Sequence, residues 1–450
     1  MAGDILVPIS VVTLVTMMGC GPVESENNFF GRELFGVKTP YLWTRQHMDM
    51  TDLASVQYKG QTCNAVYVDG LYRHGARYPL RESINGMYEL RKLLSNGNGI
   101  DQFVVNWVSA FTVEKEAQLS VLGQQEMAVL GKRLGSRYQS LLNNQLDRIK
   151  FYSSNKDRTK DSVTFFQKGL DTALGTHVSA TTTLDNNMLR FYDSCKSYQK
   201  LLNNDKTFEE YHKFLAGPEM RDVVAKVNNA VLSGHSNLSI DQVLMIKKIC
   251  VYELAFFNTS DWCNYLSLQE LEVMDYAGDI WSNIIGGYRY KITSQMSCPL
   301  FKHVFKQMDK VVTDESDRPS ASFRFTHVVP VFSMYTALGL FNGSHTLRAS
   351  DYLANAGRQF RSSVILPFSA NLVTTMYKCG TDYMVRMMVN EEEVDIPACG
   401  APMCPYTVMK EHYKHFVNCD FDKVCENLDT NTGTRTLASA VTAIFLLALF

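Results

Sequence analysis

The sequence predicts an α/β fold in which helices flank a mostly parallel β-sheet and a mostly helical cap domain is inserted into the chain. Three short runs rich in β-forming residues are each followed by a turn and a helical stretch, as in open α/β sheets. Residues 171–298 lack this order and contain stretches with helical periodicity, such as 220–232 and 269–288. With 450 residues, 46% of them hydrophobic, the chain is long enough to bury a large core around such an insertion.

The three β-rich runs lead into the residues that we expect to carry the function. Residues 65–72 lead into Arg73, residues 148–152 into a polar loop and a helix from about Arg158, and residues 322–326 into His327 and an apolar helix over 331–341. In open α/β sheets, ligands bind beyond the carboxyl ends of the strands, so residues that follow three such strands can share one site. We therefore expect one pocket to be lined by Arg73, His74, Arg77, Arg158 and His327.

Apolar segments lie at both ends of the chain. Residues 5–20 have the length of a signal-peptide core, although Asp4 replaces the usual positive flank, and a buried N-terminal helix is the alternative. Residues 437–450 follow the small and polar residues 431–433, which is the order of a glycolipid anchor signal with attachment near Asn431. A single-pass tail is the alternative, although this run is short for a bilayer.

These features divide the chain into five expected parts. They are a signal peptide (1–22), the first part of the α/β domain (30–170), the helical cap (171–298), the second part of the α/β domain (299–426) and a C-terminal anchor signal (427–450). We therefore expect a protein of the secretory pathway. It would be secreted, or held on the extracellular face of the plasma membrane by a lipid anchor or a short tail.

The cysteine count fits an oxidising compartment. Of eleven cysteines, ten remain if Cys20 leaves with the signal peptide, and an even number favours disulfides over metal sites. No group of His and Cys has metal-ligand spacing, so we predict no metal and no cofactor. Two pairs are close enough for local bridges, but spacing alone leaves the pairing open: Cys399/Cys404 and Cys419/Cys425. Three N-glycosylation sequons fit the same route: Asn237, Asn258 and Asn342.

The overall charge excludes some classes of partner. Acidic and basic residues number 46 and 44, so no global field attracts nucleic acid or an anionic membrane surface. Any anion site must therefore be local. The partner that we expect is a small phosphorylated molecule and not a nucleic acid, and the sequence indicates no oligomeric state.

The segment 73–79, which reads Arg-His-Gly-Ala-Arg-Tyr-Pro, holds residues suited to phosphoryl transfer. Transfer through a covalent intermediate needs a nucleophile and several cations around the phosphate oxygens. The neutral imidazole of His74 can attack phosphorus, while the guanidiniums of Arg73 and Arg77 stay charged and bind phosphate oxygens bidentately. An isolated Arg-His pair more often belongs to a solvated loop, so the inference depends on the complete string and on its place after a strand.

The string Arg-His-Gly-x-Arg-x-Pro after a strand is the signature of the histidine acid phosphatases, and the chain resembles that family. More narrowly, it is similar to the multiple inositol polyphosphate phosphatases. Similar strings lie along most of the chain, at 35–39, 122–125, 153–158, 189–193, 217–220, 361–362 and 390–391. The resemblance implies a phosphoglycerate-mutase-like sheet with a helical cap. It also implies metal-independent removal of phosphates from inositol polyphosphates such as phytate, through a phosphohistidine.

The resemblance also implies a role for each candidate residue. His74 matches the nucleophile, and the phosphate-binding residues are Arg73, Arg77, Arg158 and His327. For Arg158 the alternative is a surface arginine at a helix N-terminus, and for His327 it is a core histidine.

The sequence departs from the family directly after His327. Related phosphatases carry His-Ala-Glu or His-Asp there, whereas this chain has Val329 in the place of the glutamate. A positioned general acid contributes ~10²–10⁴-fold in rate, and an inositol alkoxide is a poor leaving group. A carboxylate from the cap is one possible substitute for the missing acid.

Two functions therefore stay open at this point. The first is an inositol polyphosphate phosphatase of normal or reduced activity, and the second is a non-catalytic surface protein that binds phosphorylated ligands. The retained His74 favours the enzyme, whereas Val329 favours the binding protein. A phosphoglycerate-mutase-like transferase shares the arginine and histidine chemistry but fits the secretory features poorly.

Overall fold

One mixed sheet of nine strands organises the part of the chain that the computed structural model describes. That part is residues 32–426, apart from 47, 49, 96–99, 101, 233–236 and 344–345. The strand order is β4-β3-β5-β2-β6-β7-β8, with β1 paired to β2 and β9 paired to β7. The predicted signal peptide and anchor signal lie outside the described residues.

The parallel half of the sheet contains the three predicted strands as direct neighbours. They are β2 (Gln61–Arg73), β3 (Ile149–Ser153) and β5 (Ala321–Thr326), and the short β4 (Thr182–Leu184) completes this half. The strand β5 pairs in parallel with both β2 and β3, with Arg73 opposite Thr326 and Ser153 opposite Phe325. Because of this register, the carboxyl ends of all three strands lie at one edge of the sheet.

The other half of the sheet is antiparallel, so the expectation of a mostly parallel sheet is wrong. Strand β2 pairs antiparallel with β6 (Asn371–Cys379), and β6 turns through Gly380 into β7 (Asp382–Val389). The remaining antiparallel strands are β1 (Ser55–Tyr58), β8 (Glu392–Val394) and β9 (Met403–Pro405). Two-residue connections permit only antiparallel neighbours.

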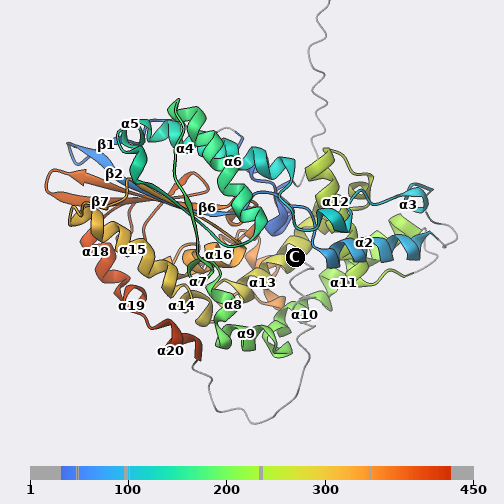
Figure 1. Cartoon of the computed structure of the whole chain (residues 1–450). Coiled ribbons are helices and arrows are strands. Elements are labelled where there is room, and N and C mark those ends of the chain that lie inside the picture. The colour runs from blue at the N-terminus through green and yellow to red at the C-terminus, as the bar shows by residue number, and fades with distance from the viewer. Residues whose placement is uncertain are drawn as a thin grey trace, which may run out of the picture. The chain divides into compact units, whose positions relative to one another are not determined.

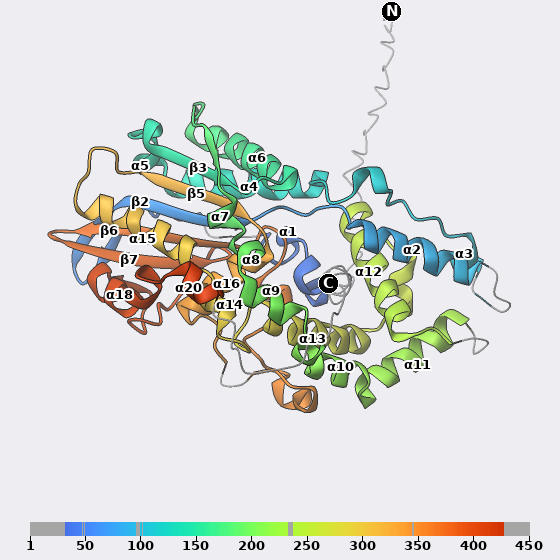
Figure 2. The same ribbon diagram turned by 60° about the horizontal axis from the view of Figure 1, so that its bottom comes forward.

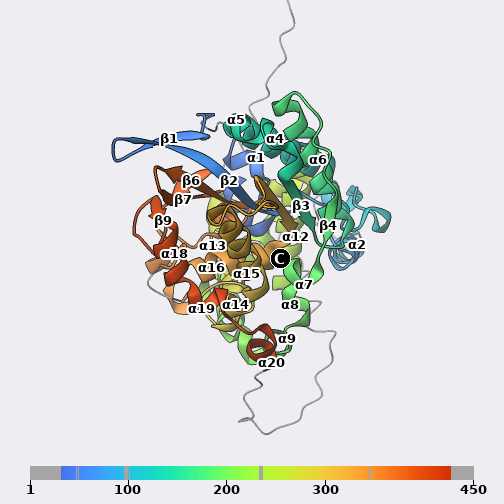
Figure 3. The ribbon, with the colours of Figure 1, turned by 60° about the vertical axis from the view of Figure 1, so that its left-hand side comes forward.

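Helices cover both faces of the sheet (Figures 1 and 3). On one face α4 (Val121–Arg137) and α6 (Asp157–Leu174) pack together over the parallel strands, and on the other lie α15 (Cys298–Val312) and α16 (Val328–Leu338). The backbones of α4 and α6 approach so closely that a Cβ on Gly169 would lie 1.9 Å from the carbonyl oxygen of Ala128. This contact fixes how closely α4 and α6 approach each other.

The segment between β4 and β5 is helical. Two of its predicted helices are α11 (Pro218–Leu232) and α13 (Leu268–Ile285), and α12 (Ile240–Phe257) lies between them in sequence. The sequence did not reveal that α2 (Arg81–Leu94) and α3 (Gln102–Asn106) lie beside α11 and α12, away from the sheet (Figure 2). The indole Nε1 of Trp107 donates to Oε1 of Glu253 at 2.7 Å and links the two segments.

The remaining α-helices are short. They are α1 (Tyr41–Thr44), α5 (Gln139–Asn143), α7 (Asn186–Leu189), α8 (Phe191–Ser194), α9 (Lys196–Leu202), α10 (Glu209–Leu215), α14 (Ile292–Gln295), α17 (Ser362–Ile365), α18 (Tyr406–His412), α19 (Lys414–Val417) and α20 (Phe421–Glu426). None of the helices in residues 32–426 that the structure describes is both long enough and apolar enough to cross a bilayer.

All ten cysteines of the described residues form disulfides. The bonds are Cys63–Cys379, Cys195–Cys425, Cys250–Cys263, Cys298–Cys419 and Cys399–Cys404. The local Cys399–Cys404 bridge is therefore confirmed. A Cys419–Cys425 bridge is wrong, because Cys419 bonds Cys298 and Cys425 bonds Cys195. The sequon residues Asn237, Asn258 and Asn342 are exposed, as glycosylation requires.

The contact between α4 and α6 generates a stability prediction. We expect Gly169→Ala to lower the free energy of unfolding by about 3 kcal/mol, because the new methyl group meets backbone atoms that cannot rotate away. Urea denaturation measures the effect. The matched control is Gly357→Ala, where a Cβ meets nothing within 4 Å. Equal stability of both variants would contradict the close packing.

Candidate functional site

The loops that follow the three parallel strands bring the five predicted residues together. The amide of His74 donates to the carbonyl of Thr326 at 2.9 Å, so the pairing of β2 with β5 continues one residue past the strand. His327 is the N-cap of α16, and its ring lies 5.5 Å from the His74 ring, centroid to centroid. The two imidazoles thus lie edge to face at the sheet edge.

Arg158 reaches this pair from the first turn of α6. Its Nη2 lies 3.3 Å from Nδ1 of His327, while the Nε2 of that ring lies 2.9 Å from Oγ of Ser154. A guanidinium only donates, so Nδ1 of His327 accepts and Nε2 carries the proton. The helix α6 therefore directs both a cation and its positive N-terminus at the two imidazoles.

Arg73 and Arg77 are also buried near His74. Nη1 of Arg73 donates to the carbonyls of Val37, Leu366 and Pro367 at 2.6, 2.8 and 2.9 Å. Among the buried side-chain atoms that the structure describes, the Nε atoms of Arg73, Arg77 and Arg158 have no hydrogen-bond partner. A buried donor without an acceptor is costly, and a bound oxyanion would satisfy such donors.

The protonation state of His74 follows from its surroundings. Burial lowers the pKa of His74 well below its usual value, and the positive charges of Arg158 and Arg73 lower it further. The ring is therefore neutral at pH 7. Its Nδ1 lies 2.9 Å from the carbonyl oxygen of Gly75, which can only accept, so Nδ1 carries the proton. The lone pair is then on Nε2, where a nucleophile needs it.

The surrounding cations keep their charge. Burial, followed by the charge of Arg77, lowers the pKa of Arg73 to about 9 and that of Arg158 to about 10. Both values lie above neutral pH. Burial and Arg158 likewise lower the pKa of His327 well below its usual value. The site is a buried field of positive charge around two neutral imidazoles, which suits a doubly charged phosphate group.

Glu126 holds the loop that carries His74, and the sequence reasoning missed it. From α4, its Oε2 accepts from the amide of Ala76 at 2.9 Å and from Oγ of Ser369 at 2.8 Å, while Oε1 accepts from the amide of Tyr41 at 2.7 Å. The only sequence signal was the family-like string at 122–125, which stops one residue short of Glu126.

Arg190 is a second residue that the sequence did not single out. It forms an ion pair with Asp193 at 2.6 Å, and its buried Nε has no hydrogen-bond partner in the described part of the chain. Its charge also lowers the pKa of His327. Arg190 therefore adds to the positive field on the side of the site that faces α8.

Val329 is the residue at which the family resemblance led us to expect an acid. It is 6% exposed and lies in the first turn of α16, two residues after His327. An apolar side chain there can donate no proton.

In the described ranges, no group of three or more His, Cys, Asp and Glu residues has an arrangement that could hold a metal ion.

The sequence is similar to known proteins over most of its length. Residues 66–390 match the histidine phosphatase superfamily, branch 2. The multiple inositol polyphosphate phosphatase 1 of Gallus gallus is 30% identical over 413 residues, which are 87% of this chain and 92% of that protein.

Two solved structures share the fold. A Bifidobacterium longum multiple inositol polyphosphate phosphatase in complex with inositol hexasulfate superposes with a TM-score of 0.67 and 17% identity, covering 85% of this chain and 97% of that one. The phytase from D. castellii superposes with a TM-score of 0.71 and 18% identity, covering 88% of each chain.

Glu126 generates a prediction about pH. Burial raises the pKa of Glu126 to about 7, so folding binds a proton between about pH 4.5 and pH 7. The contribution of this carboxyl to stability is therefore present in acid and lost as the pH rises through 7. Glu126→Gln does not ionise and resembles the protonated carboxyl. In urea denaturation, its stability relative to the wild type should rise by up to ~3 kcal/mol between pH 5 and pH 8, because only the wild type loses this contribution.

The matched control for this titration is Glu89→Gln, at an exposed position on α2. Its stability difference from the wild type should stay near zero at every pH. A difference for Glu126→Gln that does not change between pH 5 and pH 8 would contradict the assigned protonation.

Proposed function

The chain belongs to branch 2 of the histidine phosphatase superfamily, and on this premise we propose that it removes phosphates from inositol polyphosphates through a phosphohistidine on His74. One observation carries the proposal: a neutral His74, with its lone pair on Nε2, lies inside a buried cluster of arginines. The substrate class is supported by the names of the Gallus gallus relative and of the Bifidobacterium longum structure.

The proposed reaction has two steps. First, Nε2 of His74 attacks phosphorus, the P–N bond forms, and the P–O bond to the inositol breaks with release of an alkoxide that must take up a proton. Second, water attacks the phosphohistidine, inorganic phosphate leaves, and the free imidazole returns. Arg73, Arg77, Arg158 and His327 would bind the phosphoryl oxygens in both steps and stabilise the charge that develops on them.

The finer proposal is that the first step is slow for inositol phosphates. Val329 supplies no proton to the alkoxide, whereas a phenolate leaves without one. We therefore propose a phosphatase whose rate depends strongly on the leaving group. The nucleophile and the four phosphate-binding residues are all present, so binding of a phosphate group does not depend on the missing acid.

We also propose that the protein works in the secretory pathway or on the extracellular face of the cell. Five disulfides in the described residues and three exposed sequon asparagines support an oxidising compartment. Attachment through a lipid near Asn431 remains part of this proposal and rests on the sequence alone.

The first functional prediction concerns the nucleophile and the leaving group. The purified protein should release phosphate from an aryl phosphate faster than from phytate, and His74→Ala should abolish both activities in a phosphate-release assay. The control is His212→Ala, an exposed histidine of α10, which should keep the wild-type rates. Undiminished turnover by His74→Ala would exclude the proposed nucleophile, and a wild type that binds phosphate without turnover would favour a binding protein.

The second functional prediction concerns the acid. We expect Val329→Glu to raise the rate on phytate by ~10²-fold relative to the rate on the aryl phosphate. At this 6% exposed position, burial raises the pKa of a carboxyl, whereas the helix N-terminus and the arginines of the site lower it, so the rates are compared at acidic pH, where the new group is protonated and can donate. Val329→Gln has the same shape and no proton to transfer, and it should give no increase. Equal effects of both variants would contradict the proposal.

A further inference from the structure

Two buried aspartates of helix α13, Asp275 and Asp279, bond both chain segments that hold the side chain of Arg73. One segment is the 3-10 turn η2 (Gly36–Lys38), and the other is α17 with the residues directly after it. We propose that these two carboxylates are positioning residues, which set the guanidinium of Arg73 for binding of the reacting phosphoryl group, an inference that rests on the proposed function and deepens it.

The guanidinium of Arg73 is held by backbone carbonyls and by one aromatic ring. Its Nη1 donates at 2.6, 2.8 and 2.9 Å to the carbonyls of Val37, Leu366 and Pro367. Its central carbon lies 4.6 Å from the centroid of the Phe368 ring. Because Nη1 has only two hydrogens and the guanidinium is planar, these carbonyls leave Nε and Nη2 for the phosphoryl oxygens. A movement of the carbonyls would therefore move the two nitrogens that bind phosphate.

Asp279 holds the segment that carries two of these carbonyls. Its Oδ1 accepts from the amide of Ser362 at 2.7 Å and from Oγ of the same residue at 2.6 Å. Ser362 begins the single turn α17, and its own carbonyl accepts from the amide of Leu366 at 3.0 Å. Only this turn separates the Asp279 carboxylate from the carbonyls of Leu366 and Pro367.

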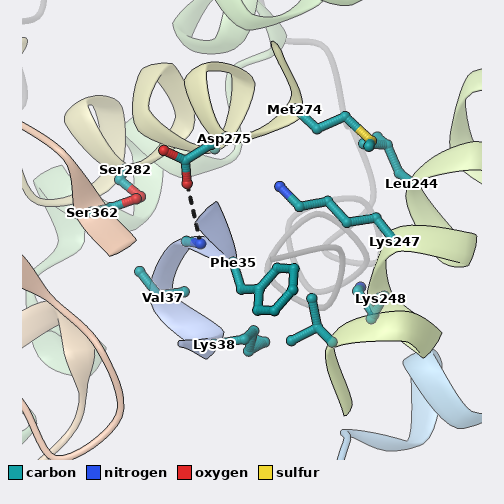
Figure 4. A pocket seen from close by; sticks show the side chains of 13 residues that line it. Phe35, Val37, Lys38, Leu244, Lys247, Lys248, Met274, Asp275, Ser282 and Ser362 are labelled. Atoms are coloured by element: carbon teal, nitrogen blue, oxygen red, sulfur yellow. Dashed lines mark hydrogen bonds between the residues drawn. The ribbon is translucent and has the colours of Figure 1, made fainter. Parts of the chain in front are cut away.

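Asp275 holds the segment that carries the third carbonyl. Its Oδ1 accepts from the amide of Gly36 at 3.3 Å, and Gly36 directly precedes Val37. Figure 4 shows Asp275 extending from α13 to the backbone of η2, where the dashed line marks this bond. Its Oδ2 also accepts from Oγ of Ser363 at 3.4 Å. Asp275 therefore joins η2 and α17 to the same helix.

Arg358 balances part of the negative charge of the two aspartates. Its Nη2 lies 3.1 Å from Oδ2 of Asp275, and its Nε lies 2.5 Å from Oδ2 of Asp279. Buried carboxylates are costly unless they are paired and hydrogen-bonded. Three further charged or titratable groups face this cluster: Arg361, whose Nη2 lies 3.9 Å from Asp275, Lys247 of α12, and Tyr276 of α13, whose ring lies under Arg358.

The arrangement around Asp279 depends on its ionisation. Its two oxygens accept from three donors: the amide and Oγ of Ser362, and Nε of Arg358. A proton on either oxygen would face a donor, so at least one of these bonds is lost when the group is neutral. Burial, followed by the charge of Asp275, raises the pKa of Asp279 to about 6. We therefore expect the hold on α17 to be complete above pH 6 and weaker below it.

Titration calorimetry with myo-inositol hexakissulfate tests this role without any need for turnover, and the sulfate groups of this probe stay ionised from pH 4.5 to pH 8. On the full chain, Asp279→Asn should bind the probe ~10-fold more weakly than the wild type at pH 8. At pH 4.5 the difference should fall below ~2-fold, because the wild-type carboxyl is then protonated as well. The direction is informative, since the loss of a negative charge by itself strengthens the binding of an anion.

Two controls separate positioning from other effects. Glu272→Gln removes the same charge from an exposed position of α13, and it should bind the probe within ~2-fold of the wild type at both pH values. In an Arg73→Met background, Asp279→Asn should change the affinity by less than ~2-fold, because no guanidinium is left to be positioned.

The other outcomes overturn the inference. An unchanged or tighter affinity of Asp279→Asn at pH 8 means that the aspartates hold the two segments without acting on Arg73. A loss that is equal at both pH values, or equally large in the Arg73→Met background, means a general change of structure.

Folding and the proposed function are controlled separately. If thermal unfolding shows that Asp279→Asn does not fold, Ser362→Ala gives the comparison, because it loses only the Oγ bond and keeps every charge. It should bind the probe ~3-fold more weakly at pH 8, and an unchanged affinity overturns the inference. Failure of the proposed function appears as the absence of His74-dependent phosphate release, whereas failure of the positioning role appears only in the affinity for the probe.

Discussion

The buried positive charge at the carboxyl edge of three parallel strands is the constraint on which the rest of the structure depends. Charges of one sign repel and lose hydration when they are buried together, so they persist only where the backbone holds them and a ligand of opposite charge binds. The register of β2, β3 and β5 supplies the common edge, and the close packing of α4 against α6 fixes the approach of Arg158. Glu126 ties the loop of His74 to Ser369 and Tyr41.

Much of this site could be predicted from the sequence because its signals are local. A strand followed by a polar loop places a residue at the sheet edge whatever the rest of the chain does, and so Arg73, Arg158 and His327 were found from single runs. Helical periodicity in α11 and α13 is local in the same way. The string Arg-His-Gly-x-Arg-x-Pro after β2 predicted the type of reaction, because it combines a nucleophile with two guanidiniums.

The parts that could not be predicted depend on pairing between distant segments. The antiparallel strand β6 joins β2 across about three hundred residues, as does the Cys63–Cys379 bridge with its separation of 316, and no local pattern records either partner. Glu126 lies on a helix whose sequence reads as an ordinary amphipathic helix. Its importance comes from what the fold packs against it, the amide of Ala76.

In the proposed reaction, the residue at position 329 affects the chemical steps and not the binding of phosphate. Because no carboxyl at this position protonates the leaving alkoxide, we propose that formation of the phosphohistidine from inositol phosphates is slow. A phenolate leaves without a proton, so with an aryl phosphate the hydrolysis of the phosphohistidine becomes limiting and the covalent intermediate accumulates.

Trapping that intermediate tests the central claim most directly. The protein is mixed with an excess of an aryl phosphate, quenched in alkali within milliseconds to seconds, and examined by peptide mass spectrometry for a phosphoryl group that is stable to base and labile to acid. The account predicts a burst of phenolate close to one equivalent per protein and a phosphoryl group on His74. Turnover without a burst and without a labelled His74, or a phosphoryl group on another residue, would contradict it.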